Sequence, residues 1–360
     1  MSAPTDVAII GGGIVGCAAA AFLAEAGVRV NLYEQDEVAA GASGRNSGSV
    51  QHPFDPVLTD LHAETLRHYR NLIDFELPPE AAGVLMLARE RSVLEPSVAE
   101  LARNSPELAP ELLAPDELRR VEPAVGPRLW GCRLDTGYPV RPGAATRAFA
   151  KRAYAAGARF HEGETAWPWV IAGRARGVLA AGVRRPAGAV LVAAGPWTPE
   201  LIDPTGSWRP IVPVWGVVAE VEMDAPPRHV LEEAGVEAVG GGGTAAIFSL
   251  VPADGQVSIG STFLPEEPDA PVWAPTLRRG GERFVPALRR GKVVGARACA
   301  RPQSFDGRPL VGELPDVEGL WTAAGHGPWG ISAGPATARI AAEALLGNIE
   351  VPASLSVARF

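Results

Sequence analysis

The chain has 360 residues, 47% of them hydrophobic, and a formal net charge of −8. This length exceeds what one hydrophobic core usually organises, so we expect a globular protein of two domains. The absence of any Lys/Arg block argues against nucleic acid and anionic membranes as main partners. Apart from a glycine-interrupted segment near the N-terminus, no stretch of about 20 apolar residues predicts a membrane span. The three cysteines form no metal-binding or redox pair, which fits a reducing, cytoplasmic location and no metal site.

The first 34 residues predict a nucleotide-binding βαβ unit. An apolar run at 6–10 is followed by a glycine turn, an Ala-rich helix and a second strand that ends in Glu34. Gly11 permits the tight turn, Gly13 lets backbone N–H groups approach a pyrophosphate, and Gly16 allows helix and strand to pack closely. Glu34 can accept hydrogen bonds from a ribose diol, and its charge disfavours a 2′-phosphate. We therefore expect a ligand with an adenosine diphosphate half.

The next segments mix helical and extended patterns. A polar, glycine-spaced loop at 41–48 precedes a helix expected over 60–76. A Pro-rich stretch then contains an expected strand at 84–88 and a short helix at 116–121.

The α/β pattern returns with a helix expected at 144–156 and strands at 158–161 and 189–195. A β-rich block follows, in which we expect strands at 214–223, 245–251, 256–261 and 292–299. The chain closes with a strand at 319–324, a glycine turn and a helix over 332–346 that Gly347 caps.

The strand–glycine–helix element at the C-terminal end favours a flavin over a nicotinamide. A reduced isoalloxazine carries negative charge near N1 and C2=O, which a helix N-terminus stabilises. FAD is also long, so its adenine, pyrophosphate and ring sites must come from distant segments. The alternative interpretation is that the last helix only covers the sheet.

Five motifs together resemble the D-amino-acid oxidase and glycine/sarcosine oxidase (DAO) family of FAD-dependent amine oxidoreductases, nearly from end to end. They are GGGIVG with Glu34, GASGRNSG at 41–48, AAGPWT at 193–198, RPQSFDGRPLVG at 301–312 and AAGHGPWGISAGPATA at 323–338. The resemblance implies the α/β fold class, in which a Rossmann-like FAD-binding domain receives an inserted, β-rich (α+β) substrate domain. We expect residues 1–80, 140–205 and 295–360 to form the FAD-binding domain, and residues 81–139 and 206–294 the substrate domain.

The same motifs predict which residues bind FAD. They are Gly11, Gly13, Ile14, Val15, Gly16, Glu34, Gln35, Ser43, Gly44, Arg45, Asn46, Ser47, Gly48, Ala194, Gly195, Trp197, Arg301, Gly325, Gly327, Trp329, Gly330, Ile331 and Ser332.

Arg301 is the expected anchor for a substrate carboxylate. The family uses an arginine followed by proline, shortly before an Asp-Gly turn, and Arg301 stands five residues before Asp306. A planar guanidinium suits a bidentate carboxylate, whereas a surface arginine paired with an acid is the alternative. The expected residues of the catalytic site are Arg301, Trp329, His326, Ser332 and His52. A structural role is the alternative for each histidine.

Cys299 stands seven residues before Asp306, where sarcosine-oxidase-like members of the family attach a cysteine covalently to the flavin. Other members bind FAD without a covalent bond, so a small core residue is the alternative.

Several positions depart from the oxidases that the chain resembles. Ser258 stands where sarcosine oxidases use a lysine to activate O₂, and Ser332 replaces their second, substrate-binding lysine. Pro328 and Ser249 fall near the arginine and tyrosine that line the pocket of glycine oxidases. These departures from the oxidases therefore favour a dehydrogenase over a fast oxidase.

The expected reaction is the FAD-dependent oxidation of a small amino acid by hydride transfer to flavin N5, after which the imine is hydrolysed. The substrate class includes D-amino acids and secondary amines such as proline-like acids or sarcosine, and glycine. An electron-acceptor protein or O₂ would reoxidise the flavin. Two alternatives stay open: oxidation of a 2-hydroxy acid, and an FAD-binding subunit of a hetero-oligomeric amine dehydrogenase.

Overall fold

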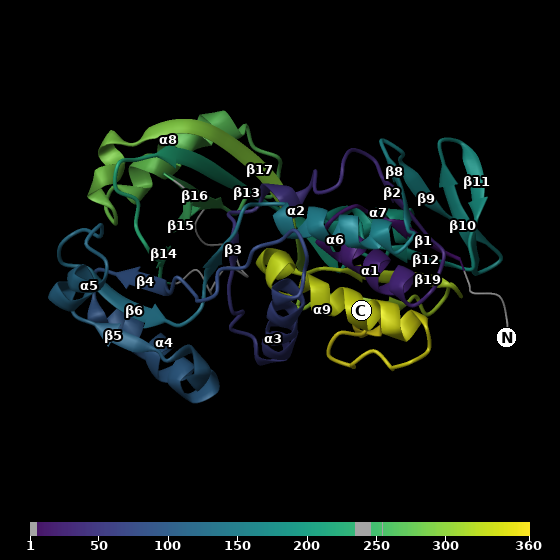
Figure 1. The fold of residues 1–360 in the computed structure, drawn as a ribbon, viewed down its shortest axis with the longest axis horizontal. Helices are drawn as coiled ribbons and strands as arrows, with labels where there is room; N and C mark the ends of the chain where they lie inside the picture. The colour runs from purple at the N-terminus through teal and green to yellow at the C-terminus, as the bar shows by residue number, and fades with distance from the viewer. Residues whose placement is uncertain (1–5, 235–245, 254) are drawn as a thin grey trace.

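Two sheets organise the chain (Figure 1). The computed structural model describes residues 6–234, 246–253 and 255–360. The six-stranded sheet lies on the right of Figure 1 and the eight-stranded sheet on the left, with helix α9 (Gly330–Leu345) reaching toward the space between them.

The six-stranded sheet is parallel apart from one edge strand. Its order is β18 (Leu310–Glu313), β19 (Leu320–Ala324), β12 (Ala189–Val192), β1 (Val7–Ile10), β2 (Val30–Glu34) and β8 (Arg159–Glu162). Only the β18–β19 pair is antiparallel. In such a sheet, ligands bind outside the carboxyl ends of the strands, where the glycine turn after β1 and the turn after β19 both lie.

Helices cover one face of this sheet. They are α1 (Ile14–Glu25), α3 (Pro56–Arg70), α6 (Ala144–Ala155) and α9, which share one hydrophobic core with the sheet. Helix α1 can be buried almost all round because its alanines let neighbouring helices approach closely. The opposite face carries a three-stranded antiparallel sheet of β9 (Ala166–Ile171), β10 (Arg174–Ala180) and β11 (Val183–Pro186).

The eight-stranded sheet forms the second half of the molecule. Its order is β17 (Lys292–Ser304), β13 (Ile211–Glu222), β16 (Gln256–Thr262), β15 (Ala246–Ala253), β14 (Val230–Glu233), β4 (Val84–Ala88), β6 (Trp130–Leu134) and β5 (Glu111–Leu113). Helix α8 (Ala270–Gly281) packs on β13 and β17, and helix α4 (Arg91–Asn104) packs on β4 and β6. The shorter elements are α2 (Ala42–Arg45), β3 (Ser49–Val50), α5 (Pro115–Val121), β7 (Tyr138–Pro139) and α7 (Thr198–Ile202).

The structure corrects several predicted element bounds. The helix expected over 60–76 is α3, which begins at Pro56 because the Asp55 carboxylate caps it, accepting from Val57 N at 2.9 Å, and which ends at Arg70. The strand expected at 292–299 continues to Ser304, and the helix expected from 332 begins at Gly330. The first residue of the strand expected at 245–251 lies outside the described residues.

Helix α4 and the three-stranded sheet β9–β11 were not predicted from the sequence. The division into domains stays a prediction, but its boundary at 295 falls inside β17, which belongs entirely to the eight-stranded sheet.

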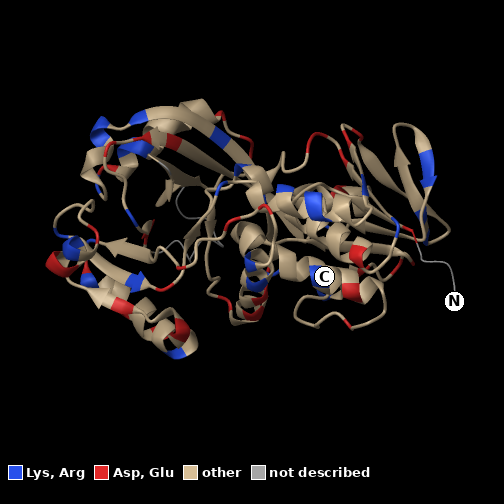
Figure 2. Ribbon diagram, viewed as in Figure 1, with Lys and Arg blue, Asp and Glu red and all other residues tan. Residues whose placement is uncertain are grey.

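Charged segments of both signs are spread over the part of the chain that the structure describes (Figure 2). In the view of Figure 2, Lys/Arg and Asp/Glu segments alternate over both halves. Within the described ranges, no helix is both long and apolar enough to cross a membrane.

Candidate functional site

A cavity of about 1500 Å³ lies between the two sheets. Its walls come from the glycine turn after β1, helix α2, the turn before α9, and strands β13 to β17 of the eight-stranded sheet. Pockets for one small ligand are typically about 300–1,000 Å³, so this cavity has room for a dinucleotide and a second molecule.

The glycine turn packs so closely against neighbouring backbone that a side chain at Gly11 or Gly16 would clash. A Cβ on Gly11, whose φ is +113°, would lie 2.4 Å from the carbonyl oxygen of Ala193. A Cβ on Gly16 would lie 2.0 Å from the carbonyl oxygen of Gly11. Gly16 itself does not line the cavity but lets α1 sit directly against the turn, so the helix N-terminus faces the cavity.

Glu34 ends β2 at the edge of this turn. Its Oε2 accepts from Gly12 N at 2.6 Å and its Oε1 accepts from Asp36 N at 3.0 Å. These bonds fix the carboxylate while Glu34 and Gln35 still line the cavity. The arrangement fits a ribose whose hydroxyl groups donate to the carboxylate.

The loop at 41–48 is shaped by its own polar side chains. Ser43 Oγ accepts from Ile14 N at 2.9 Å, so α2 touches the first turn of α1. Asn46 Nδ2 donates to the carbonyls of Ala42 and Ser43 at 3.1 and 2.8 Å, and its Oδ1 accepts from Gly48 N at 2.9 Å. These bonds hold the loop as a rigid wall of the cavity.

Arg297 of β17, which the sequence did not single out, joins this loop to the eight-stranded sheet. Its Nη2 donates to the carbonyl oxygen of Asn46 at 2.9 Å and its Nε to that of Arg45 at 3.2 Å. The same guanidinium pairs with Glu220 and contacts Ser258 Oγ at 3.3 Å. Arg297 therefore fixes the loop through backbone carbonyls.

The N-terminal turn of α9 is held by buried groups from α3. Pro335 has no N–H to donate to the Ile331 carbonyl four residues earlier, and Tyr69 Oη donates to that oxygen at 2.7 Å instead. Burial raises the pKa of Tyr69, so its hydroxyl stays a donor. His62 Nδ1 lies 3.2 Å from the Ser332 carbonyl oxygen, and burial followed by nearby His52 lowers the pKa of His62 to about 4.

His326 lies in the turn before α9 and lines the cavity. Its side chain is 2% exposed, and in the part of the chain that the structure describes its Nε2 has no hydrogen-bond partner. Burial lowers the pKa of His326 to about 4, so the ring is neutral at pH 7. A buried nitrogen left without a partner inside a cavity fits a hydrogen bond to a bound molecule.

Arg301 projects from β17 into the cavity. Its Nη1 donates to the Thr262 carbonyl oxygen at 3.0 Å, its Nη2 donates to Ser261 Oγ, and its guanidinium carbon lies 4.8 Å from the centre of the Phe263 ring. Among the described residues it has no carboxylate partner, and burial lowers its pKa. An arginine so placed is ready to receive an anionic group.

Gly216 on β13 makes room for this guanidinium, and no local sequence pattern indicates this role. Gly216 pairs with Cys299 across the sheet, two residues before Arg301. A Cβ on Gly216 would lie 2.3 Å from Arg301 Nη2. The position of Arg301 therefore depends on a glycine in the adjacent strand.

Cys299 also lines the cavity, 6% exposed. Burial raises the pKa of its thiol, against the opposing effect of Arg301 and Arg297, so the thiol form is favoured at pH 7. Covalent attachment of a flavin to Cys299 stays a prediction.

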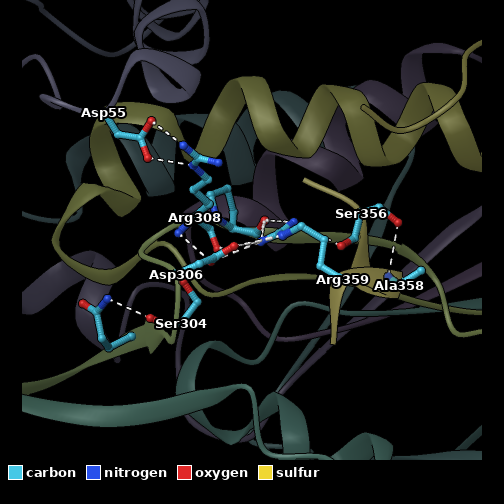
Figure 3. Close-up of polar contacts among 9 residues, drawn as sticks. Asp55, Ser304, Asp306, Arg308, Ser356, Ala358 and Arg359 are labelled. Carbon is cyan, nitrogen blue, oxygen red and sulfur yellow. Dashed lines mark hydrogen bonds and ion pairs between the residues drawn. The ribbon is translucent and has the colours of Figure 1, made fainter. Parts of the chain in front are cut away.

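The turn that follows Arg301 is tied by ion pairs to Asp55, which precedes α3, and to Arg359 near the C-terminus (Figure 3). Asp306, which lines the cavity, accepts from Arg359 Nε at 2.9 Å. Arg308 Nε donates to Asp55 at 2.7 Å, and Figure 3 shows the two side chains meeting end to end beside α9. These pairs fix the rim of the cavity next to the arginine.

Most predicted site residues lie together in the cavity wall. Those that line it are Gly11, Gly13, Ile14, Val15, Glu34, Gln35, Ser43, Arg45, Asn46, Ser47, Ala194, Gly195, Trp197, Cys299, Arg301, His326, Gly327, Trp329, Gly330, Ile331 and Ser332. Gly16, Gly44, Gly48 and Gly325 lie behind the wall, where a Cβ at each would meet neighbouring atoms within about 3 Å.

His52 is the candidate that does not lie at the cavity. It is buried, edge-on to His62 with 5.4 Å between ring centres, and its Nε2 lies 3.4 Å from Glu107. Its neighbour Gln51 lines the cavity instead, because alternate residues of an extended segment point to opposite sides. His52 therefore lies outside the cavity wall, and its role at the reacting centre stays a prediction.

The chain is similar to flavoenzymes along almost its whole length. A family model described as "FAD dependent oxidoreductase" (DAO) matches residues 6–344. A glycine oxidase of Pseudomonas aeruginosa is 28% identical over 95% of this chain and 95% of its own length, and a D-amino acid dehydrogenase of Rhizobium johnstonii is 29% identical over 79% and 66%. The crystal structure of glycine oxidase from Geobacillus kaustophilus superposes with a TM-score of 0.83 at 26% identity, covering 99% of both chains.

Proposed function

Because the chain belongs to the DAO family of FAD-dependent oxidoreductases, we propose that it oxidises the amine of a small amino acid whose carboxylate Arg301 binds. The observation that carries this proposal is Arg301 in the cavity wall without a carboxylate partner among the described residues. The relatives named glycine oxidase and D-amino acid dehydrogenase support an amino acid as the substrate class.

The residues present fit FAD. The turn at Gly11 and the carboxylate of Glu34 suit the adenosine diphosphate half, and the N-terminus of α9 suits the negatively charged edge of a reduced flavin ring. When bound, FAD supplies the two-electron acceptor for the substrate's C–H bond.

Within this site, we assign the protein groups three roles. Arg301 orients the substrate by its carboxylate, which sets the position of the Cα–H bond. Neutral His326 offers an uncharged hydrogen-bonding nitrogen, so it adds no positive charge near the ring. Trp329 and Phe54, whose rings meet edge to face with 6.2 Å between their centres, exclude water from that side of the cavity.

We propose a dehydrogenase in preference to a fast oxidase. The whole chain contains two lysines, Lys151 and Lys292, and neither lines the cavity. Ser258 does not line the cavity either, and the cation beside it, Arg297, is already paired with Glu220. No lysine ammonium is therefore placed at the cavity to activate O₂, as a lysine does in the sarcosine oxidases that this chain resembles.

The test is anaerobic bleaching of the flavin absorbance of purified protein by glycine, sarcosine, prolines, D- and L-amino acids and 2-hydroxy acids, followed by admission of air. Bleaching by an amino acid and slow return of colour in air are expected. Rapid return of colour would contradict the dehydrogenase. Bleaching only by 2-hydroxy acids would show that the substrate is a hydroxy acid and not an amine. If FAD is bound but no compound bleaches it, the result would favour an electron-transfer subunit.

A further inference from the structure

The hydroxyl of Ser261 lies beside the Arg301 guanidinium at the end of β16. Arg301 donates to two consecutive residues of this strand, from Nη2 to Ser261 Oγ and from Nη1 to the Thr262 carbonyl oxygen at 3.0 Å. Ser261 is 9% exposed, and both it and Arg301 line the cavity. The hydroxyl and the guanidinium therefore belong to the same part of the cavity wall.

A count of donors and acceptors leaves the Ser261 proton without a partner. A serine hydroxyl has one O–H donor and two acceptor lone pairs, whereas a guanidinium has five N–H donors and no acceptor. Ser261 is thus the acceptor in its contact with Arg301 and keeps its own proton to donate. Within residues 6–234, 246–253 and 255–360, no group accepts that proton. Arg301 uses two of its N–H groups in this frame, so three remain.

The neighbouring Thr262 shows how the sheet satisfies a hydroxyl that serves the fold alone. Thr262 Oγ1 accepts from Val217 N at 2.9 Å and donates to the Trp215 carbonyl oxygen at 3.2 Å. Thr262 is buried and does not line the cavity. A buried donor without an acceptor costs stability, so buried hydroxyl groups usually have both kinds of partner. The sheet leaves the Ser261 proton for a molecule that occupies the cavity.

Another serine of β16 makes a similar contact in a different electrostatic setting. Ser258 Oγ accepts from Arg297 Nη2 at 3.3 Å, and Glu220 already neutralises that arginine. Neither Ser258 nor Arg297 lines the cavity. At Ser261 the arginine has no carboxylate partner among the described residues. The ligand that fits there is an anion, which can accept from the guanidinium and from the hydroxyl at once.

Resting on the proposed function, we propose that Ser261 binds the substrate carboxylate directly, beside Arg301. The hydroxyl accepts from the guanidinium and donates to the carboxylate, so it links the two charged groups. A carboxylate can take these bonds because each of its oxygens has two acceptor sites. An amide or ester of the same acid lacks the charge and accepts more weakly, so Ser261 adds to the preference for a free carboxylate.

Calorimetric titration of the FAD-loaded protein with hexanoate tests this contact without turnover. Ser261→Ala should weaken hexanoate binding at least about 10-fold, because a hydrogen bond to a charged acceptor is lost. Ser261→Thr keeps a hydroxyl and should stay within about 3-fold of the wild type. Ser258→Ala is the matched control, because it removes a hydroxyl that also accepts from an arginine but lies away from the cavity, and it should bind hexanoate like the wild type.

Arg301→Lys separates direct binding from an effect on the orientation of Arg301. Lysine keeps the positive charge but has no guanidinium for Ser261 to hold. Adding Ser261→Ala to Arg301→Lys should still weaken hexanoate binding at least about 5-fold. No further loss in that pair, or no hexanoate binding by Arg301→Lys, would overturn the inference. Unchanged affinity in Ser261→Ala with full FAD content, or no binding by the wild type, would overturn it as well.

Anaerobic bleaching of the wild-type flavin by amino acids tests the proposed function separately. Bleaching by an amino acid together with unchanged hexanoate affinity in Ser261→Ala overturns the role of Ser261 but keeps amine oxidation. Hexanoate binding that depends on Ser261, without bleaching by any amino acid, keeps the carboxylate site and speaks against amine oxidation alone.

Discussion

Replacing Gly216 by alanine should displace the Arg301 guanidinium without replacing any residue that we assign to substrate binding. The new Cβ would lie 2.3 Å from Nη2 and 2.5 Å from Cζ and Nη1 of Arg301. Ordinary contact begins near 3.4 Å, so the guanidinium must move by about 1 Å and loses its alignment with the Thr262 carbonyl. A misplacement of about 1 Å costs on the order of 10²-fold in rate.

We therefore expect kcat/KM for anaerobic flavin reduction to fall about 10- to 100-fold in Gly216→Ala, or about 1.4–2.7 kcal/mol of transition-state stabilisation. Binding of a simple carboxylate such as hexanoate should weaken in parallel, while FAD content stays normal. Gly280→Ala is the control, because its Cβ meets no atom within 4 Å. An unchanged kcat/KM and hexanoate affinity in Gly216→Ala would refute the proposed position of Arg301.

Three further predictions concern the frame around the site. Tyr69→Phe leaves the Ile331 carbonyl unsatisfied and should lower the free energy of unfolding by about 1–3 kcal/mol in urea denaturation; Pro335→Ala, which restores the missing N–H, should make the same Tyr69 change less costly. Gly16→Ala should lose bound FAD, read as the ratio of flavin to protein absorbance, whereas Gly280→Ala, which has open space at its Cβ and does not line the cavity, should keep it. Burial lowers the pKa values of His62 and His326 to about 4 in the folded protein, whereas both histidines have the ordinary pKa of about 6.5 in the unfolded chain. As pH falls below 6.5, the unfolded chain therefore binds protons before the folded protein does. Stability should therefore decrease from pH 6.5 to pH 4, and His62→Gln should flatten that decrease; an equal slope in the variant would count against it.

The sequence was informative where a function depends on a local pattern. The βαβ unit around Gly11 and Glu34 follows from strand, turn and helix signals that are contiguous, and the predicted family, the α/β architecture and FAD are confirmed. Arg301 was placed by its neighbours in the chain, Pro302 and Asp306. The structure brings it to the cavity, and its role remains a proposal.

The rest depends on relations between strands that no local pattern contains. Gly216 matters because the register sets it beside Cys299 and under the guanidinium of Arg301. Ser261 and Arg301 meet across 40 residues of sequence, and Arg297 reaches the loop at Asn46 across 251. His52 was predicted because it follows that loop closely in sequence. In an extended segment neighbouring side chains point to opposite sides, so Gln51 lines the cavity and His52 does not.

The central claim is that Arg301 holds the carboxylate of an amino acid while the amine of that amino acid is oxidised. The most direct test compares the rate of anaerobic flavin reduction by an amino acid with the rate for the amine that lacks its carboxylate. Both rates are measured in the wild type and in Arg301→Gln. The wild type should reduce at least about 30-fold faster with the amino acid, since a buried charge pair is worth about 2 kcal/mol or more, and Arg301→Gln should abolish most of that preference. Equal rates in the wild type, or an undiminished preference in Arg301→Gln, would contradict the account.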